Sequence, residues 1–556
     1  MRVFIFFLFM CCYCFSANAS QEEKCISAAA YGAIPDDGKD DTEALRRAVE
    51  YCRKHVGVTL KIPSGVYCLR DSRAIQLEED VLSGKMGNDP EKTIFTPYYP
   101  YVRGLDFSGS DSLVVDAQGA VLLCEGWMEP ISLNDCHNVT IKGLTIDYKR
   151  KPLSQGIIQQ VKEESFTVKF DDRREITENI PITRMTIWDD ECDGFYGSAF
   201  YFPERKLLGN NLVEFKAQIP ARLQGAKLAA LHSFHFRPAI LIQNSKQITL
   251  DGVTIHSQPG MGIVGFDSSD IFLYHLSVTP APGYQFSTNT DATHFACCRG
   301  VIRFDGCFFH GQGDDATNVH GYYHSIKELK DGYATLKLEA PTFTHAQVTD
   351  VPQVGDKMEL VRISTLVPEG EYEVLDVKHA GKSVEVRVRL NGDIPSNIHD
   401  YYLFNVSKLP RLEFVRNVVW GQMARGVLVK TRGVLIEGNV FRGCSGSAIH
   451  VGAESYWKEG TFSKDVTIVG NVILNCGSSG GTFGASGIAV GIDAPDTELT
   501  KLHENMIIRD NTIITNQNNE CGIAVYNARN VKLSNNRIEG CQKEIVFHSV
   551  EGVTMK

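Results

Sequence analysis

The sequence predicts an all-β fold: a right-handed parallel β-helix with an N-terminal capping helix and two inserted β-barrel modules. Three observations predict it: a nine-residue strand pattern recurs, its closest copies are 22 to 25 residues apart, and two long interruptions lack this pattern. A regular period in this range indicates a solenoid. A β-sandwich would explain the short strands but not the period. The chain of 556 residues also exceeds one small core, which favours an elongated repeat.

The first 19 residues differ from the rest of the chain. One arginine precedes an apolar run from Val3 to Phe15, and small residues follow at 17–19. This order is typical of a secretory signal peptide, and the run is short for a membrane span. We therefore expect an exported protein, periplasmic or secreted, without a stable membrane span. A lipid anchor is disfavoured because bulky residues precede the cysteines of this segment.

Charge and cysteine content exclude some classes of partner and site. The formal net charge of −11 disfavours nucleic acid and, more weakly, polyanionic polysaccharides. Thirteen of the 16 cysteines lie beyond the signal-like segment, and no C-x-x-C pair occurs among them. Several, such as Cys307 and Cys444, follow apolar runs, so we expect buried thiols rather than a zinc or redox site.

The repeat consists of a short strand, a polar bend and a second short strand, as in NVTIKGLTI and GVLIEGNVF. Its copies begin at residues 138, 247, 270, 300, 411, 433, 465, 505, 530 and 552. Each copy fits one coil of a parallel β-helix, with coils stacked about 4.8 Å apart.

Two interruptions, 151–235 and 321–408, lack the repeat and read as antiparallel strands with polar turns, so each is predicted to be a β-barrel module. They could frame a substrate or form a dimer contact. The predicted segments are a signal peptide at 1–19, β-helix with the capping helix at 20–150, a barrel at 151–235, β-helix with paired aspartates at 236–320, a barrel at 321–408 and β-helix at 409–556.

A helix is expected before the first coils. Asp40 and Glu43 resemble a capping box. An apolar stripe follows at Ala44, Leu45, Ala48, Val49 and Cys52. Such a helix would cover the open end of the solenoid, whose first coil otherwise exposes apolar surface.

Repeat register brings aspartates together. The copies at 270 and 300 are 30 residues apart, and a Pro/Gly-rich loop at 279–286 accounts for the surplus. Without the loop, DATHF aligns with DATNV, which pairs Asp291 with Asp315 and Thr290 with Asp314. Stacked coils would hold Asp291 and Asp315 about one strand spacing apart.

Two carboxylates this close repel one another, so at least one pKa is expected to rise. One explanation is a pair that holds and activates water, with Asp314 as proton donor. An inverting glycosidase divides the work in this way, with acid and base about 6.5–9.5 Å apart. A turn with solvated aspartates or a Ca²⁺ ligand set stays an alternative, and spacing alone does not assign acid and base.

Two families carry similar motifs. NTD at 289–291 and GDD at 313–315 resemble the catalytic motifs of glycoside hydrolase family 28, whose fold is a pectin-lyase-like β-helix. The Gly-His-Gly motif of that family is absent here, and in GVLVKT Leu428 stands where its uronate-binding arginine would be, while Lys430 remains.

The closer resemblance is to glycoside hydrolase family 110, and it covers nearly all of the mature chain: an interrupted β-helix, the aspartate triad and ARGVLVKTRG at 424–433. It implies an inverting exo-α-1,3-galactosidase that removes terminal galactose, as in the blood group B antigen. It also implies that Asp314 is the general acid and that Asp291 and Asp315 position and deprotonate water.

Four further residues are candidates for substrate binding: His294, Arg425, Lys430 and Trp457. Arg425 and Lys430 could contact sugar hydroxyls or be solvated, His294 could bond near the site or be structural, and Trp457 could stack on a pyranose or simply pack. We expect a glycan substrate, no cofactor and no metal. Another β-helix reaction, uronate hydrolysis or polysaccharide lysis, and a non-catalytic glycan-binding solenoid stay open. So do the choice between branched and linear substrates and the oligomeric state, for which a homodimer through a module is one option.

Overall fold

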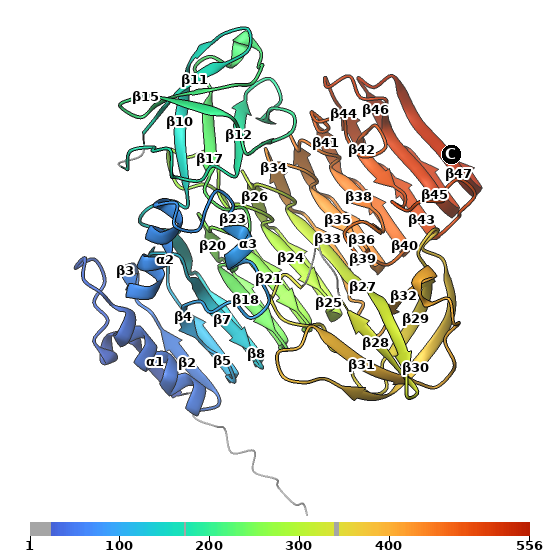
Figure 1. Ribbon diagram of the computed structural model, residues 1–556, viewed down its shortest axis with the longest axis horizontal. Helices are drawn as coiled ribbons and strands as arrows, with labels where there is room; N and C mark the ends of the chain where they lie inside the picture. Colours follow the sequence, from blue (N-terminus) through green and yellow to red (C-terminus); the bar gives the residue numbers. More distant parts are fainter. Residues whose placement is uncertain (1–23, 172–173, 338–343) are drawn as a thin grey trace, which may run out of the picture.

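The computed structural model describes residues 24–171, 174–337 and 344–556. Short strands stack along one axis from the N-terminal to the C-terminal end, so the fold is the predicted right-handed parallel β-helix (Figure 1). The predicted signal peptide lies outside the described residues. Among the helices of the described part, none is long and apolar enough to cross a membrane.

Each complete coil contributes three strands, which stack into three parallel sheets. The first stack contains β4 (Arg103–Asp106), β7 (Glu129–Asn134), β18 (Ile240–Gln243), β21 (Ile263–Phe266), β24 (Thr293–Ala296), β27 (Thr317–Lys330), β35 (Val427–Val429), β38 (Ile449–Val451), β42 (Ala485–Val490), β45 (Cys521–Ser534) and β47 (Lys543–Met555). The second contains β1 (Lys24–Ser27), β2 (Val58–Lys61), β5 (Asp111–Asp116), β8 (His137–Lys142), β19 (Lys246–Asp251), β22 (Ser269–Tyr274), β25 (Arg299–Asp305), β33 (Arg411–Val415), β36 (Arg432–Glu437), β40 (Lys464–Val469), β43 (His503–Arg509) and the later parts of β45 and β47. The third contains β3 (Gly65–Arg70), β6 (Ala120–Glu125), β9 (Thr145–Tyr148), β20 (Thr254–Ile255), β23 (Ser277–Val278), β26 (Phe308–His310), β34 (Val418–Trp420), β37 (Val440–Arg442), β41 (Val472–Leu474), β44 (Thr512–Ile514) and β46 (Arg537–Glu539).

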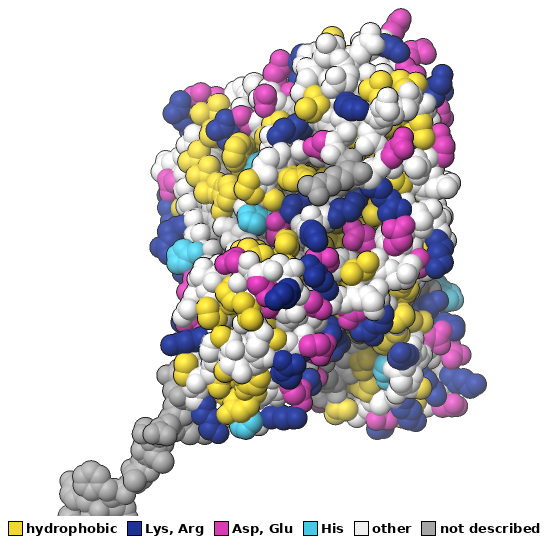
Figure 2. Space-filling view, turned by 90° about the vertical axis from the view of Figure 1, so that its left-hand side faces the viewer, with side chains coloured by type: hydrophobic (Ala, Val, Ile, Leu, Met, Phe, Trp, Pro, Cys, Tyr) yellow, Lys and Arg dark blue, Asp and Glu magenta, His cyan; other side chains and the backbone are white. Residues whose placement is uncertain are grey.

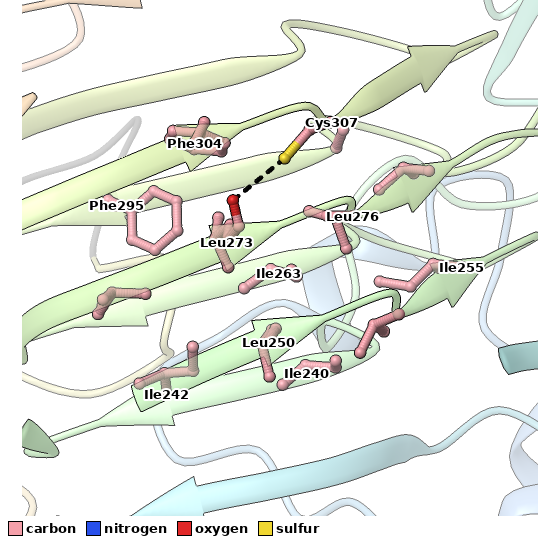
Figure 3. Packing of buried hydrophobic residues seen from close by; sticks show 14 of the residues in the cluster. Ile240, Ile242, Leu250, Ile255, Ile263, Leu273, Leu276, Phe295, Phe304 and Cys307 are labelled. Carbon is pink, nitrogen blue, oxygen red and sulfur yellow. Dashed lines mark hydrogen bonds between the residues drawn. The ribbon is translucent and has the colours of Figure 1, made fainter. Parts of the chain in front are cut away.

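The repeat found in the sequence is the second stack followed by the third. Ile248 pairs with Ile271, Ile271 with Ile302, and Ile302 with Leu412, so equivalent apolar residues of successive coils lie in line. Alternation along each strand sends one set of side chains into the solenoid, where they pack as stacked rows (Figure 3). All 13 cysteines of the described residues are free, and most are buried, which agrees with the prediction.

The first module is an antiparallel sheet that is inserted in the chain after β9 and before β18. Its elements are β10 (Leu153–Val161), β11 (Phe166–Phe170), β12 (Arg184–Asp189), β13 (Gly194–Phe195), β14 (Phe200–Tyr201), β15 (Arg205–Gly209), β16 (Leu212–Phe215), η2 (Ala221–Leu223) and β17 (Lys227–Leu231). Within the described residues the strand order is open, with β13 and β15 at its ends.

The second module begins in the continuation of β27 and projects from the opposite side of the solenoid (Figure 1). It adds β28 (Tyr333–Lys337), β29 (Lys357–Arg362), β30 (Pro368–Lys378), β31 (Glu385–Leu390), η3 (Ile398–Asp400) and β32 (Tyr401–Asn405). Its antiparallel pairings run from β27 through β28, β31, β30, β29 and β32 back to β27. Because the first module is open, the prediction of two inserted barrels is not confirmed as it stands. The structure shows two inserted antiparallel sheets.

The remaining helical elements lie near the N-terminal end: η1 (Ala28–Tyr31), α1 (Thr42–Lys54), α2 (Ser72–Leu82) and α3 (Glu91–Ile94). α1 buries the predicted apolar stripe against the first coils. Figure 2 looks at this end and shows charged side chains of both signs, with hydrophobic patches between them. The predicted capping box is wrong in detail, because Asp40 accepts the N–H of Thr42 at 3.0 Å while Glu43 pairs with Arg46 instead.

Candidate active site

Three residues from successive coils form a column just before the strands of the first stack. Thr293 pairs with Thr317, and Thr317 with Val427, which puts Asp291, Asp315 and Arg425 in register. The Asp291–Asp315 register is the one predicted from the repeat. The backbone supports it, since the N–H of Ala292 donates to the carbonyl oxygen of Asp315 at 3.0 Å.

Asp291 and Asp315 lie close together, and hydrogen bonds fix the orientation of their carboxylates. The backbone N–H of Asp315 donates to Oδ1 of Asp291 at 3.2 Å. Arg425 donates to both carboxylate oxygens of Asp315, from its backbone N–H at 2.7 Å and its guanidinium at 3.0 Å. Asp291 and Asp315 are only 4% and 2% exposed, whereas Asp314 is half-buried. Asp314 is therefore the aspartate of the three that solvent reaches most readily.

The three carboxyl groups converge. One carboxylate oxygen from each of Asp291, Asp314 and Asp315 lies within 4.8 Å of the others. The cause is local, because Asp314 and Asp315 are adjacent on one tight turn and Asp291 occupies the next coil. Gly313 makes this turn possible, since a Cβ there would lie 2.1 Å from the carbonyl oxygen of Asn289.

Electrostatics favour protons on this group. Burial, reinforced by the Asp314 carboxylate, raises the pKa of Asp291 well above its usual value. Burial also raises the pKa of Asp315, where the Arg425 guanidinium opposes the shift and Asp314 and Asp291 add to it. The two buried carboxyls therefore do not titrate independently.

Histidines extend the site along the outer face of the first stack. On β24 and β27, Phe295 and Val319 point into the core, and the alternate residues His294 and His320 point outward. Nδ1 of His294 lies 2.7 Å from Oδ2 of Asp291, and its Nε2 lies 2.7 Å from Nε2 of His320. His294 thus contacts a predicted catalytic residue directly.

Lys430 is completely buried and forms ion pairs with Glu454, from the loop that follows β38, and with Glu459 of β39 (Glu459–Gly460). The amide of Asn318 also donates to Glu459 at 3.1 Å. Trp457 lies on the same loop, 44% exposed, with its ring against that of Tyr456. The structure therefore places Lys430 in a buried ionic network and Trp457 at the surface, and their substrate-binding roles stay predictions.

A second wall of the site comes from segments that the sequence did not single out. His235 follows β17 and bonds to Glu91 of α3 at 2.7 Å. Burial lowers the pKa of His235, but Glu91 together with Asp314 and Asp291 raises it above its usual value. The ring of His235 stacks on Phe95, and both lie near His345 of the second module.

The residues that the sequence analysis missed are His235, His320, His345 and Glu454. The best available signal was His320, which alternates with Asn318 on the strand that follows Asp315. Two groups of these side chains have donor atoms close enough to hold a cation. One group is the three aspartates, and the other is His294, His320, His345 and Glu459.

Stacked parallel coils with three converging aspartates and an arginine clamp define this chain as a β-helix protein with a carboxylate-based candidate active site. A family model described as "Right handed beta helix region" matches residues 402–556. Alpha-1,3-galactosidase A of Bacteroides fragilis is 27% identical over 549 residues, covering 93% of this chain and 87% of that protein. Alpha-1,3-galactosidase B of Parabacteroides distasonis is 26% identical over 547 residues, covering 90% and 86%.

Among solved structures, a hyperthermoactive exopolygalacturonase from Thermotoga maritima is 11% identical, with 96% of this chain and 92% of that chain covered and a TM-score of 0.45. The sequence similarity to proteins named α-1,3-galactosidase thus spans nearly the whole chain. The resemblance predicted from the motifs is confirmed.

Proposed function

We propose that this chain is an exo-acting, inverting α-1,3-galactosidase that hydrolyses terminal non-reducing α-1,3-linked galactose, including that of blood group B antigens. The observation that carries the proposal is the convergence of Asp291, Asp314 and Asp315 beside Arg425. The similarity to proteins named α-1,3-galactosidase supports a glycoside hydrolase and, within that class, a galactosidase.

Each aspartate has a role that its surroundings support. Asp314 is the most accessible of the three and acts as the acid that protonates the leaving glycosidic oxygen. Asp315 acts as the base that takes a proton from water, and Arg425 fixes the orientation of its carboxylate. Asp291 accepts the backbone N–H of Asp315 and helps to hold the same water.

The stereochemical outcome needs a direct measurement. Carboxyl groups of inverting enzymes are typically about 6.5–9.5 Å apart and those of retaining enzymes about 5–5.5 Å. One oxygen of each aspartate lies within 4.8 Å of the others, which is a limit on single atoms and not a separation of the carboxyl groups. Inversion therefore rests on the family resemblance, not on the separation.

A uronate substrate is disfavoured by charge. Arg425 is committed to Asp315, and Lys430 to Glu454 and Glu459. Both cations therefore already have carboxylate partners within the chain, and an anionic sugar would be repelled by the neighbouring aspartates.

The test is a proton NMR time course with branched B trisaccharide and, in parallel, linear α-1,3-galactobiose. β-Galactose as the first product supports the proposal, and the two rates give the substrate preference. α-Galactose first would overturn inversion, and no galactose from either would overturn the function.

Asp314→Asn should abolish release without lowering the melting temperature, because the side chain is half-exposed and the substitution is nearly isosteric. Asp393→Asn, at an exposed position of the second module, is the matched control and should retain activity. We also propose export, directed by the signal-like residues 1–19. Recovery of the unprocessed chain in the cytoplasm of its host would contradict export.

A further inference from the structure

A second cluster of polar side chains lies directly beside the aspartates. It consists of His294, His320, His345 and Glu459, all buried, each with one donor atom within 4.8 Å of the others. The four residues come from β24, β27, the second module and β39. Segments far apart in sequence therefore converge on one point inside the protein.

The outer nitrogen of each imidazole already has a partner. Nδ1 of His294 faces Asp291 at 2.7 Å, Nδ1 of His320 faces the carbonyl of Gly321 at 2.9 Å, and Nδ1 of His345 faces the hydroxyl of Tyr322 at 3.0 Å. A carbonyl oxygen can only accept, so His320 carries its proton on Nδ1 and its Nε2 bears a lone pair. Bonds from the outer nitrogen to carboxylate, carbonyl or hydroxyl oxygens are typical of metal-ligating histidines.

The inner nitrogens of two of the histidines face one another. Nε2 of His294 and Nε2 of His320 are 2.7 Å apart. Two lone pairs at this distance repel, so either the N–H of one neutral imidazole or a metal ion lies between them.

A shared proton between His294 and His320 would also involve only two of the four residues of the cluster. Oε1 of Glu459 lies 3.6 Å from Nε2 of His320. Among the residues that the structure describes, no hydrogen bond uses Nε2 of His345. A metal ion would use both of these atoms, whereas a proton between two nitrogens uses neither.

Charge balance points the same way. The cluster, the three adjacent aspartates and Glu454 together contain five carboxylates, and the cations in contact with them are Arg425 and Lys430. Burying unbalanced charge is costly, so protons or a bound cation must offset the excess. A divalent ion would offset two of the negative charges at once.

We propose that His294, His320, His345 and Glu459 form a divalent metal site of the zinc type. Three imidazole nitrogens and one carboxylate oxygen match the ligands and coordination number that zinc prefers. The burial of all four ligands indicates a closed site that holds residues in place rather than one that binds sugar. Through His294 the ion would orient Asp291, as carboxylate–histidine–metal triads do. The site departs from the metal-free expectation of the sequence analysis and does not depend on the proposed function.

The test measures metal in the mature chain, purified without a histidine tag. Elemental analysis after gel filtration should find about one zinc per chain. His345→Gln and Glu459→Gln should each lose it, while Asp314→Asn, which keeps all four ligands, should retain it. Loading the metal-free protein with Co²⁺ alone should produce the visible absorption of tetrahedral cobalt, which is absent from both ligand variants.

A measurement on the wild type covers the case in which a variant fails to fold. A chelator should lower the melting temperature, and Zn²⁺ alone should restore it. No metal at purification and none bound after addition of Zn²⁺ or Co²⁺ would overturn the site and leave a proton between His294 and His320. Metal retained in both folded ligand variants would also overturn it. Neither readout uses galactose release, so the site and the function fail separately.

Discussion

Arg425 holds Asp315 by two hydrogen bonds, at 2.7 Å from its backbone N–H and 3.0 Å from its guanidinium, although 110 residues separate them. The clamp has two effects. It fixes the direction of the Asp315 carboxylate, and it opposes the rise in the pKa of Asp315 that burial and the neighbouring aspartates cause.

Arg425→Gln should therefore move the acidic limb of the pH profile of kcat/KM to higher pH. Loss of a cation disfavours the ionised carboxylate, so the pKa of Asp315 rises and the base is lost sooner as the pH falls. Disturbed positioning should also lower kcat/KM at neutral pH by about 10²-fold. Arg416→Gln, whose guanidinium pairs with Asp305 instead, is the control and should leave the profile unchanged. An acidic limb that stays in place in Arg425→Gln would show that Asp315 is not the base.

Asp350 belongs to the second module and contacts the solenoid through the thiol of Cys297, which donates to it at 3.3 Å. It is buried and bonds to Lys408 at 2.7 Å and to His324 at 2.9 Å. Burial raises the pKa of Asp350, but Lys408 and His324 outweigh burial and hold the pKa well below its usual value. Asp350→Asn should lower the free energy of unfolding near neutral pH by about 1.5–3 kcal/mol, because it removes one of the two carboxylates that bond to buried Lys408 and leaves only Asp267.

The pH dependence of this loss follows from the sign of the shift. A carboxyl with a depressed pKa stabilises the folded state above its unfolded pKa of about 3.9, and this stabilisation is lost as the pH falls through the folded pKa. Melting temperatures of wild type and Asp350→Asn should therefore differ at pH 7 and converge below about pH 3.9. Asp393→Asn should match the wild type throughout. A gap that widens in acid would contradict this account.

Buried asparagines stack along the C-terminal coils. The side-chain amide of Asn439 donates to Asn471 at 2.9 Å, and that of Asn471 donates to Asn511 at 2.9 Å. Asn471→Ala should lower the free energy of unfolding by about 1–3 kcal/mol, because it leaves polar groups of both neighbours unpaired. Denaturant unfolding measures the change. Asn397→Ala, at an exposed position, should cost little, and equal losses in the two variants would argue against the stack as a stabilising element.

Trp457 and Tyr456 are both exposed on the loop that leads into β39, where Glu459 lies. If Trp457 stacks on a sugar ring, Trp457→Ala should raise KM by roughly 2- to 12-fold, equivalent to about 0.5–1.5 kcal/mol, with kcat and melting temperature unchanged. Tyr456→Ala is the matched control, and a smaller effect is expected there. Equal KM for wild type and Trp457→Ala would remove this residue from the substrate site.

The sequence predicted what depends on local alternation. Apolar residues at every second position identified the strands, and the interval between copies placed Asp291 over Asp315 before any coordinates. The contact between Asp315 and Arg425 could have been predicted by the same reasoning. The repeats at 300 and 411 are separated by nearly the same number of residues as Asp315 and Arg425. The inserted module hid this relationship.

Residues brought by loops and modules could not be predicted in this way. His235, His345 and Glu454 lie outside the repeat, so their positions depend on how separate segments pack across the solenoid. Periodicity specifies the face of a strand on which a residue lies, but not which loop covers that face. Burial of Lys430 was missed for the same reason, because its partners Glu454 and Glu459 lie on a loop and on the short strand that follows it, both outside the repeat.

The chain order of the clamp also sets an order in time during synthesis. Asp315 leaves the ribosome 110 residues before Arg425, which at about 5–20 residues per second is a delay of about 5–20 s. During that interval the coil that carries Asp315 is the growing edge of the solenoid, and the next strand to be made belongs to the second module. We therefore expect this module to fold while the edge of the solenoid is still open, so that the nascent protein gains its candidate active site only after its appendage is complete.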